Sequence, residues 1–252
     1  MSVDYLAEHL LAVPPHRALL RAVECKLMGQ VPLTPPVLDI GAGDGHFASA
    51  AYDRPIDAGI DLRLRDLREA RARPGVYRAL LAASATALPF RDAAFNTVVS
   101  NCAIEHIPSL CDVLREIARV LRPGGTFATT LPSERFAEFL AGSRLLGPVY
   151  GRFFNRISRH YHVHPPEWWR ETLQLAGLRV VEQRYYFSPA AHRTFDLSHY
   201  AGVPNLIARL LTGSWALRPF QARLLERWFR PYYEEPWPET GAYQFVRCER
   251  MA

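Results

Sequence analysis

The stretch that most constrains the fold is "VLDIGAGDGHF", residues 37–47. A short apolar run meets an aspartate, and three glycines then alternate with other residues. Glycine reaches positive φ without steric cost and lets a ligand approach the backbone closely. The pattern therefore predicts a buried strand, a tight turn with exposed amide groups, and a helix. In an open parallel sheet such turns lie at the carboxyl ends of strands, where ligands bind.

The rest of the chain alternates between strand and helix patterns. Short apolar runs predict strands at 36–42, 57–62, 76–84, 95–102, 126–132, 179–188 and 241–250. Helical periodicity is found at 15–29, 45–53, 63–73, 109–125 and 165–178. Strands that alternate with helices are typical of an α/β fold, in which helices cover both faces of a parallel sheet.

The spacing of the glycines argues against a dinucleotide site. Such a site usually has Gly-x-Gly-x-x-Gly, in which the third glycine allows close packing of the helix. Here Gly41, Gly43 and Gly45 alternate, and His46 stands at the sixth position. Asp39 also places a negative charge where a pyrophosphate would be repelled and a cationic amino group attracted. We therefore expect a ligand that joins an adenosine to an amino-acid tail.

A second acidic residue lies at the end of the next predicted strand. Asp61 follows the glycine turn and closes the strand at 57–62. A carboxylate at this point can accept hydrogen bonds from both hydroxyl groups of a ribose. The alternative is a solvated aspartate at a strand end. The glycine turn nearby favours the ribose-binding role.

Four stretches resemble, in order and spacing, successive motifs of the class I S-adenosylmethionine-dependent methyltransferases. They are "VLDIGAGDG", "GIDL", "ATALPFRDAAFNTVVSNCAIEHI" and "LREIARVLRPGG". The likeness is greatest to the small-molecule group that includes the ubiquinone and menaquinone enzymes, known as methyltransferase type 11. It implies a Rossmann-like, mostly parallel seven-stranded sheet with helices on both faces and an antiparallel last strand. It also implies S-adenosyl-L-methionine as cofactor and methyl transfer of class EC 2.1.1.

The resemblance further implies roles for individual residues. Asp39 and Gly41 would border the methionine part of the cofactor, Gly43 and Gly45 would give it room, and Asp61 would bind the ribose. The family often has an acid that binds the adenine amine where this chain has Ser84, so the backbone around Ala85 would read the adenine edge. The remaining expected cofactor-binding residues are Ala42, Leu62 and Asn101.

Glu105 and His106, which follow the strand at 95–102, are candidates for catalysis. Methyl transfer from a sulfonium is an in-line displacement in which the protein mainly positions the reactants. An oxygen or nitrogen acceptor can also need a general base. Glu105 and His106 are the nearest candidates in sequence, and a structural role is the alternative for each.

The segment "RHYHVHPP" contains three alternating histidines, His160, His162 and His164. In an extended segment their side chains would point the same way. We expect His162 to act as a base on the acceptor side, with a structural or surface role as the alternative. Histidine is a good metal ligand, but no carboxylate or cysteine completes an obvious set nearby in the sequence. No metal site is expected.

Two long excursions interrupt the alternating pattern, at 133–165 and 188–240. The first is aromatic, basic and irregular, and the second has apolar helical faces at 206–211 and 217–229 with interleaved arginines. We expect one methyltransferase domain over 1–252, with both excursions as cap insertions on the acceptor side. They would suit a small-molecule acceptor that is bulky and apolar or lipid-linked. The alternative for 205–230 is peripheral contact with a membrane.

Composition favours a cytoplasmic protein. The four cysteines have no CxxC spacing, and the first residues lack the basic start and long apolar core of a signal peptide. A formal net charge of +5 is weak evidence for nucleic acid as a partner, and no RNA-binding module is recognisable, so none is expected. Two alternatives stay open beside the small-molecule enzyme. They are an RNA or protein methyltransferase and a non-catalytic S-adenosylmethionine-binding protein.

Overall fold

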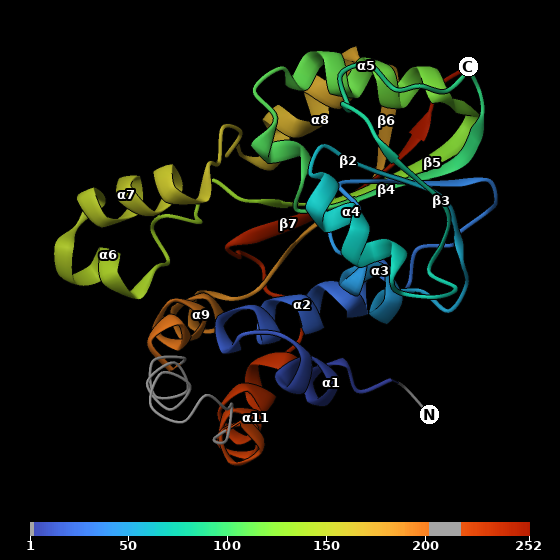
Figure 1. The fold of residues 1–252 in the computed structure, drawn as a ribbon. Helices are drawn as coiled ribbons and strands as arrows, with labels where there is room; N and C mark the ends of the chain where they lie inside the picture. The colour runs from blue at the N-terminus through green and yellow to red at the C-terminus, as the bar shows by residue number, and fades with distance from the viewer. Residues whose placement is uncertain (1–2, 202–217) are drawn as a thin grey trace. The chain divides into compact units, whose positions relative to one another are not determined.

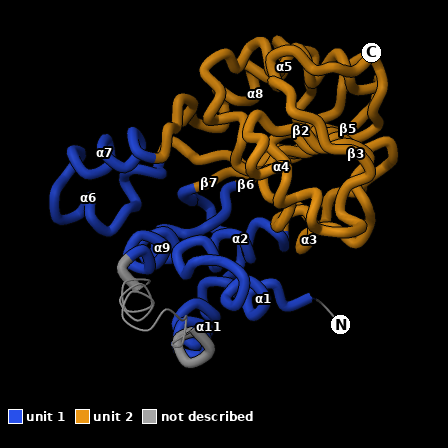
Figure 2. Tube along the Cα trace, viewed as in Figure 1, with its two compact units in different colours: residues 1–26, 135–157, 185–242 blue, residues 27–134, 158–184, 243–252 orange. Residues whose placement is uncertain are grey.

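The computed structural model describes residues 3–201 and 218–252, which fall into two compact units. Unit 1 is drawn from residues 1–26, 135–157 and 185–242, and unit 2 from 27–134, 158–184 and 243–252 (Figure 2). The helical face predicted at 206–211 lies outside the described residues. No described helix is long and apolar enough to span a bilayer.

Unit 2 is built around a seven-stranded sheet in the order β3-β2-β1-β4-β5-β7-β6 (Figure 1). The first five strands pair in parallel, and β7 runs antiparallel to β5. This confirms the predicted fold class. The strands are β1 (Val37–Ile40), β2 (Ile56–Asp61), β3 (Tyr77–Ala82), β4 (Phe95–Asn101), β5 (Leu121–Pro132), β6 (Leu178–Tyr186) and β7 (Tyr243–Arg250).

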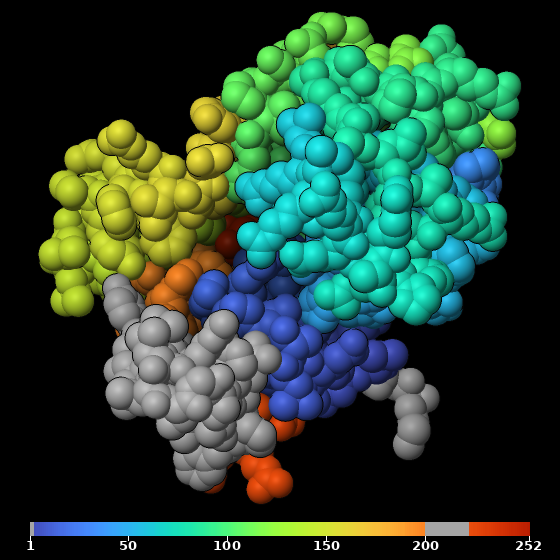
Figure 3. All heavy atoms as spheres, viewed as in Figure 1, coloured from blue at the N-terminus to red at the C-terminus, as the bar shows by residue number. Residues whose placement is uncertain are grey.

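Helices cover both faces of this sheet (Figure 1). One face carries α5 and α8, and the other carries α3 and α4. Residues of α4 and β3, coloured cyan, form much of the surface of unit 2 seen in Figure 3. The helices of this unit are α3 (His46–Ala51), α4 (Leu64–Arg71), the 3₁₀ turn η1 (Ile104–His106), α5 (Leu110–Val120) and α8 (Pro166–Leu175).

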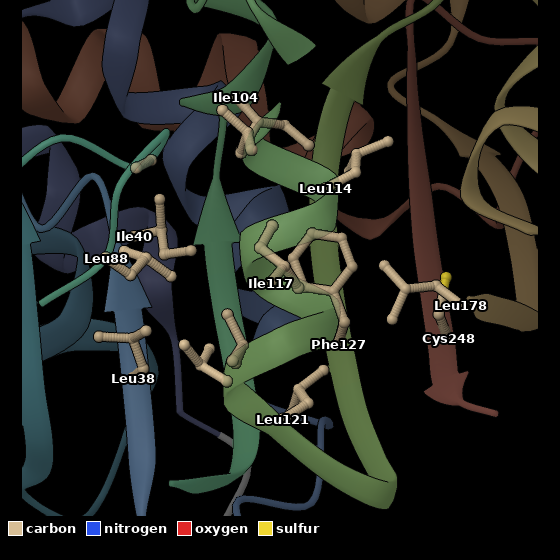
Figure 4. Packing of buried hydrophobic residues seen from close by; sticks show 14 of the residues in the cluster. Leu38, Ile40, Leu88, Ile104, Leu114, Ile117, Leu121, Phe127, Leu178 and Cys248 are labelled. Atoms are coloured by element: carbon tan, nitrogen blue, oxygen red, sulfur yellow. The ribbon is translucent and has the colours of Figure 1, made fainter. Parts of the chain in front are cut away.

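The core of unit 2 forms where α5 packs on the sheet. The buried residues of α5 recur at helical spacing, so one apolar stripe faces the strands. Leu114 and Ile117 on this stripe lie beside Phe127 of β5, and Ile40 of β1 points into the same layer (Figure 4). Successive strand residues point to opposite faces. Asp39, which precedes Ile40, therefore faces away from this core.

The helix predicted at 109–125 ends earlier than expected. α5 stops at Val120, and β5 begins at Leu121. Pro123 cannot donate the backbone hydrogen bond that a helix needs, and Gly124 has φ of +74°, outside the helical region. The Arg-Pro-Gly-Gly segment therefore follows the helix and lies in the first part of β5.

Unit 1 is helical in its described part. Its helices are α1 (Tyr5–Ala12), most of α2 (Pro15–Met28), α6 (Ala141–Leu146), α7 (Pro148–Ser158, to residue 157), α9 (Pro189–Ala201) and α11 (Arg218–Glu234). The expectation of an irregular segment at 133–165 is wrong, because α6 and α7 form there. The helix predicted at 15–29 is confirmed as α2. α1 packs against α11, and Asp4 before α1 pairs with Arg230 at 2.9 Å.

Candidate functional site

The three glycines of the turn after β1 meet different surroundings. A side chain at Gly41 would collide with the Cβ of Ala103, and one at Gly45 would lie 3.2 Å from Ala70. A Cβ at Gly43 would meet only the carbonyl oxygen of Gly41, at 3.9 Å. All three have positive φ, so each suits glycine. Packing requires the first and third glycines to be small, whereas the second faces open space where a ligand can approach.

Asp61 at the end of β2 is tied to this turn. Its Oδ2 accepts a hydrogen bond from the amide of Gly43 at 3.0 Å, and its Oδ1 accepts one from the amide of Arg63 at 2.8 Å. A carboxylate has about four lone-pair sites, so both oxygens keep acceptor capacity for further donors. The carboxylate thus orders the turn and also presents acceptors beside it.

Asp39 has a partner that the sequence analysis missed. The hydroxyl of Tyr77 in β3 donates a hydrogen bond to Oδ2 of Asp39 at 2.5 Å. The Tyr77 ring lies over Gly59 of β2, where a Cβ would come within 2.7 Å of it. The absence of a side chain at Gly59 thus leaves room for Tyr77 of β3 to cross β2 and reach Asp39 in β1. This glycine in the strand "DAGIDL" was the only sequence signal of a close approach.

Burial raises the free energy of the charged Asp39 carboxylate. Asp39 is buried, and this burial, together with the nearby charge of Asp61, raises its pKa from 3.8 to about 6. The hydrogen bond from Tyr77 acts in the opposite direction and lowers that pKa. The pKa of the Tyr77 hydroxyl is itself raised well above its usual value by burial and by Asp39, so the hydroxyl stays protonated as a donor. A cationic group placed beside Asp39 would offset the cost of its charge.

The expected adenine-side residues differ in their exposure. Leu62 is 70% exposed although it is apolar, directly after Asp61. The hydroxyl of Ser84 lies 2.7 Å from that of Thr86 and accepts the Thr86 amide at 3.2 Å, so it closes a local turn. Ala85 is buried. Leu62 therefore offers a flat apolar surface, and Ser84 contributes mainly to the shape of its own loop.

The end of β4 is fastened to β1 and β5. The buried hydroxyl of Ser100 donates to the carbonyl of Ile40 at 3.0 Å, and Oδ1 of Asn101 accepts from Thr130 at 2.8 Å. Cys102 then takes φ of +46°. This turn brings Ala103 against Gly41, so the segments after β1 and β4 meet closely. The amide of Ala42 donates to Ile60 at 2.9 Å, which joins the same segment to β2.

Glu105 and His106 form a cluster with His160. Glu105 is almost fully buried, and its Oε1 lies 3.8 Å from Nε2 of His106. The rings of His106 and His160 stack with centroids 5.2 Å apart. Burial, with a smaller effect of His106, lowers the pKa of His160 to about 4, which makes it neutral at pH 7. The backbone amide of Tyr161 donates to the Glu105 carbonyl at 3.0 Å and holds the two segments together.

The other two histidines of "RHYHVHPP" have different surroundings. Nε2 of His162 lies 3.0 Å from the carbonyl oxygen of Ile107 and 3.2 Å from that of Pro108, so this nitrogen is the donor. His164 stacks on Trp168 with centroids 3.6 Å apart. The ring that lies with Glu105 and His106 is therefore His160, whereas the sequence analysis favoured His162. A general-base role for His162 stays a prediction and would use Nδ1.

The cluster also has the composition of a metal site. One ligand atom from each of Glu105, His106 and His160 lies within 4.8 Å of the other two. A carboxylate and two imidazoles suit ions such as Zn²⁺. Nδ1 of His106 lies 3.1 Å from the carbonyl of Arg159, a contact that commonly orients a ligating imidazole. The carboxylate that seemed missing near the histidines is thus supplied by Glu105, which is distant in sequence.

Part of this chain is similar to known methyltransferases. Residues 38–129 match the family described as a methyltransferase domain. A malonyl-[acyl-carrier protein] O-methyltransferase of Enterobacter lignolyticus is 33% identical over 147 residues, which cover 56% of this chain and 58% of that protein. A demethylmenaquinone methyltransferase of Listeria welshimeri is 29% identical over 129 residues, which cover 49% and 52%. The chain spans little more than half the length of these curated relatives.

A solved structure supports the fold over nearly the whole chain. An S-adenosylmethionine-dependent methyltransferase from Thermotoga maritima aligns with a TM-score of 0.60 at 19% identity. The alignment covers 93% of this chain and 90% of that one. At this identity the likeness shows the fold alone.

Replacing Gly43 by Ala is expected to weaken binding of S-adenosylhomocysteine by about tenfold or more, because the added methyl group enters the open space of the turn. Calorimetry measures the dissociation constant. Gly75→Ala is the matched control, since Gly75 also has positive φ, +78°, and a Cβ there would meet nothing within 4 Å. Both variants carry a similar backbone strain of about 1–2 kcal/mol. Equal losses of affinity in the two variants would contradict the prediction that the ligand occupies the open space beside Gly43.

Replacing Asp39 by Asn is expected to stabilise the fold and weaken ligand binding. The raised pKa means that the folded state holds a proton that the unfolded state releases between pH 3.8 and about 6. The contribution of Asp39 to the free energy of unfolding is therefore fully present below pH 3.8 and falls as the pH rises through 6. At neutral pH, Asp39→Asn should raise the free energy of unfolding by about 1–3 kcal/mol.

Urea unfolding of the parent and Asp39→Asn proteins across pH 4–8 measures this effect. The difference between the two proteins should grow as the pH rises and level off above the raised pKa of Asp39. Calorimetry at neutral pH should show weaker binding of S-adenosylhomocysteine by the variant, because the carboxylate no longer faces the ligand's amino group. A variant that is less stable than the parent at pH 8 would show that burial does not penalise the Asp39 charge.

Proposed function

We propose that this chain is a class I S-adenosylmethionine-dependent methyltransferase that transfers a methyl group from S-adenosyl-L-methionine to a small-molecule acceptor, which its matched domain and its fold support. The observation that carries the proposal is the turn at Gly43, which is open to a ligand and anchored by the Asp61 carboxylate. These residues fit the cofactor, because a carboxylate with spare acceptor capacity lies beside a backbone that a ligand can approach closely. When bound, the cofactor supplies an electrophilic methyl group.

The residues near the turn divide the binding task by their chemistry. Asp61 accepts the ribose hydroxyl groups while it holds the Gly43 amide. Asp39, kept in place by Tyr77, attracts the positively charged amino group of the methionine part. Leu62 covers one face of the adenine, and the backbone around Ala85 reads its edge. Gly41, Ala42, Gly45 and Asn101 shape the methionine end.

The proposed chemistry combines orientation with proton transfer. In-line displacement needs the acceptor atom to be aligned, and fixed groups supply most of this benefit. Either Glu105 or His106 accepts the proton that an oxygen or nitrogen acceptor loses, directly or through water. His160, neutral because of its lowered pKa, stacks on His106 and limits its orientation. His162 remains a second candidate base.

The proposed acceptor is a bulky apolar or lipid-linked small molecule. One relative is named for an acyl-carrier-bound malonyl group and another for demethylmenaquinone. These names support small-molecule methylation, and both concern proteins that this chain matches over little more than half their length. We keep the prediction that 133–165 and 188–240 select the acceptor. A protein that stays in the cytoplasm or associates peripherally with a membrane fits this proposal.

Asp61→Ala is expected to weaken binding of S-adenosylhomocysteine about tenfold to a hundredfold, because two hydroxyl groups lose their acceptor at a cost of roughly 1–3 kcal/mol. Calorimetry measures the dissociation constant. Asp112→Ala is the control, since Asp112 lies on the exposed side of α5 and pairs with Arg115. Tight binding of NAD by the parent protein, without binding of S-adenosylhomocysteine, would overturn the proposed function.

Glu105→Gln is expected to lower kcat by roughly 10²–10⁴ with little change in cofactor affinity, because the variant keeps the shape of the side chain but cannot take up a proton. Transfer of a radiolabelled methyl group to a panel of malonyl thioesters, quinols and lipids first identifies an acceptor. His164→Gln is the control, since His164 stacks on Trp168. Treatment with a chelator should leave the rate unchanged. A loss that added Zn²⁺ restores would show that the cluster acts as a metal site.

A further inference from the structure

The helices α6 and α7 use one face to pack within unit 1. The hydroxyl of Tyr150 donates to Oδ1 of Asp196 in α9 at 2.7 Å, and the amide of Gly142 donates to Oδ2 at 2.9 Å. Phe154 is buried against Phe136 and Phe195, with ring centroids 5.9 Å and 6.4 Å apart. This face of the helix pair therefore packs against other residues of unit 1.

A second, adjoining face of the same helices is also apolar, but it is exposed. We call it the outer face of α6 and α7. Its five large apolar residues are between 57% and 87% exposed, which is unusual for side chains of this size on one short segment. They are Leu145, Leu146, Val149, Phe153 and Ile157. The last three recur every fourth residue and form one stripe along α7, and residues of both helices reach the surface of unit 1 (yellow-green in Figure 3).

The charges around this stripe have a single sign. Arg144, Arg152 and Arg156 are exposed and flank the apolar residues. No aspartate or glutamate occurs between Glu138 and Glu167. Exposed arginines elsewhere are often neutralised locally, as in the pair of Arg115 with Asp112 at 2.8 Å. Here no acid lies within the segment, so the positive charge is available to an external anion.

We propose that the outer face of α6 and α7 docks on the surface of an anionic lipid bilayer. An interfacial helix places its apolar residues among the acyl chains and its arginines at the headgroups, where they attract anionic lipid. Arginine stems can extend sideways to keep the guanidinium in water while the apolar stripe is buried. The exposed side chains form a projecting stripe on a convex helix, which a fluid bilayer accommodates without a shaped groove.

The described part of 205–230 is less suited to this role. Leu224 and Trp228 of α11 are exposed, but acidic residues interleave with the arginines of that helix. Arg230 pairs with Glu226 and with Asp4. The outer face of α6 and α7 therefore has the stronger combination of exposed apolar surface and unopposed positive charge. This inference does not depend on the identity of the methyl acceptor.

Sedimentation with vesicles tests the inference on the whole protein. The parent protein should sediment with vesicles of phosphatidylcholine and phosphatidylglycerol and remain in solution with phosphatidylcholine alone. The double variant Phe153→Ser, Ile157→Ser should bind about a hundredfold more weakly, about tenfold for each change, because each removes an apolar side chain that the bilayer would bury. Arg152→Gln and Arg156→Gln should each weaken binding about fivefold, and added salt should reduce the difference.

A matched double variant, Leu11→Ser with Leu175→Ser, removes two apolar residues elsewhere that are at least as exposed, at 59% and 90%, and should bind like the parent. Thermal unfolding of every variant checks that the fold is kept. Absence of parent binding to the anionic vesicles would overturn the inference, and so would equal binding of the two double variants. The parent protein could instead form a dimer that does not bind vesicles and that the Phe153→Ser, Ile157→Ser variant converts to a monomer. That result would show that the outer face of α6 and α7 binds a second copy of the chain and not lipid.

Discussion

The site depends on the contact between the segments that follow β1 and β4. Gly41 has no room for a side chain because Ala103 lies against it, and the left-handed turn at Cys102 brings Ala103 there. This contact aligns the glycine turn with Asp61 on one side and with the Glu105 cluster on the other. The proposed cofactor-binding and catalytic residues thus come from three neighbouring strand ends, as is usual in open parallel sheets.

Asp39 shows a conflict between stability and binding within this arrangement. A buried carboxylate with a raised pKa opposes folding at neutral pH, and the hydrogen bond from Tyr77 offsets only part of that cost. The proposed contact with the amino group of the cofactor gives a reason for a charge at this position. Destabilising polar groups of this kind are common at functional sites, where activity requires them. The same reasoning does not apply to Ser100, whose buried hydroxyl is satisfied by the Ile40 carbonyl.

Sequence patterns predicted the sheet, the glycine turn and the position of Asp61, because these depend on local periodicity and on residues with special backbone freedom. The partner of Asp39 could not be predicted, since Tyr77 reaches it only through the pairing of β3 with β2 and of β2 with β1. His160 joins Glu105 for a similar reason, through backbone hydrogen bonds between distant segments. The helices α6 and α7 were missed because they are apolar on two faces, which obscures helical periodicity.

A crystal structure of the protein with S-adenosylhomocysteine would show whether the Gly43 turn and Asp61 together hold the cofactor. The account predicts ribose hydroxyl groups within about 2.6–3.2 Å of the Asp61 carboxylate oxygens, with the ligand backbone against Gly43. It also predicts that Tyr77 still donates to Asp39 in the complex. A ligand bound elsewhere on the molecule, with Asp61 making only its contacts to Gly43 and Arg63, would contradict the account.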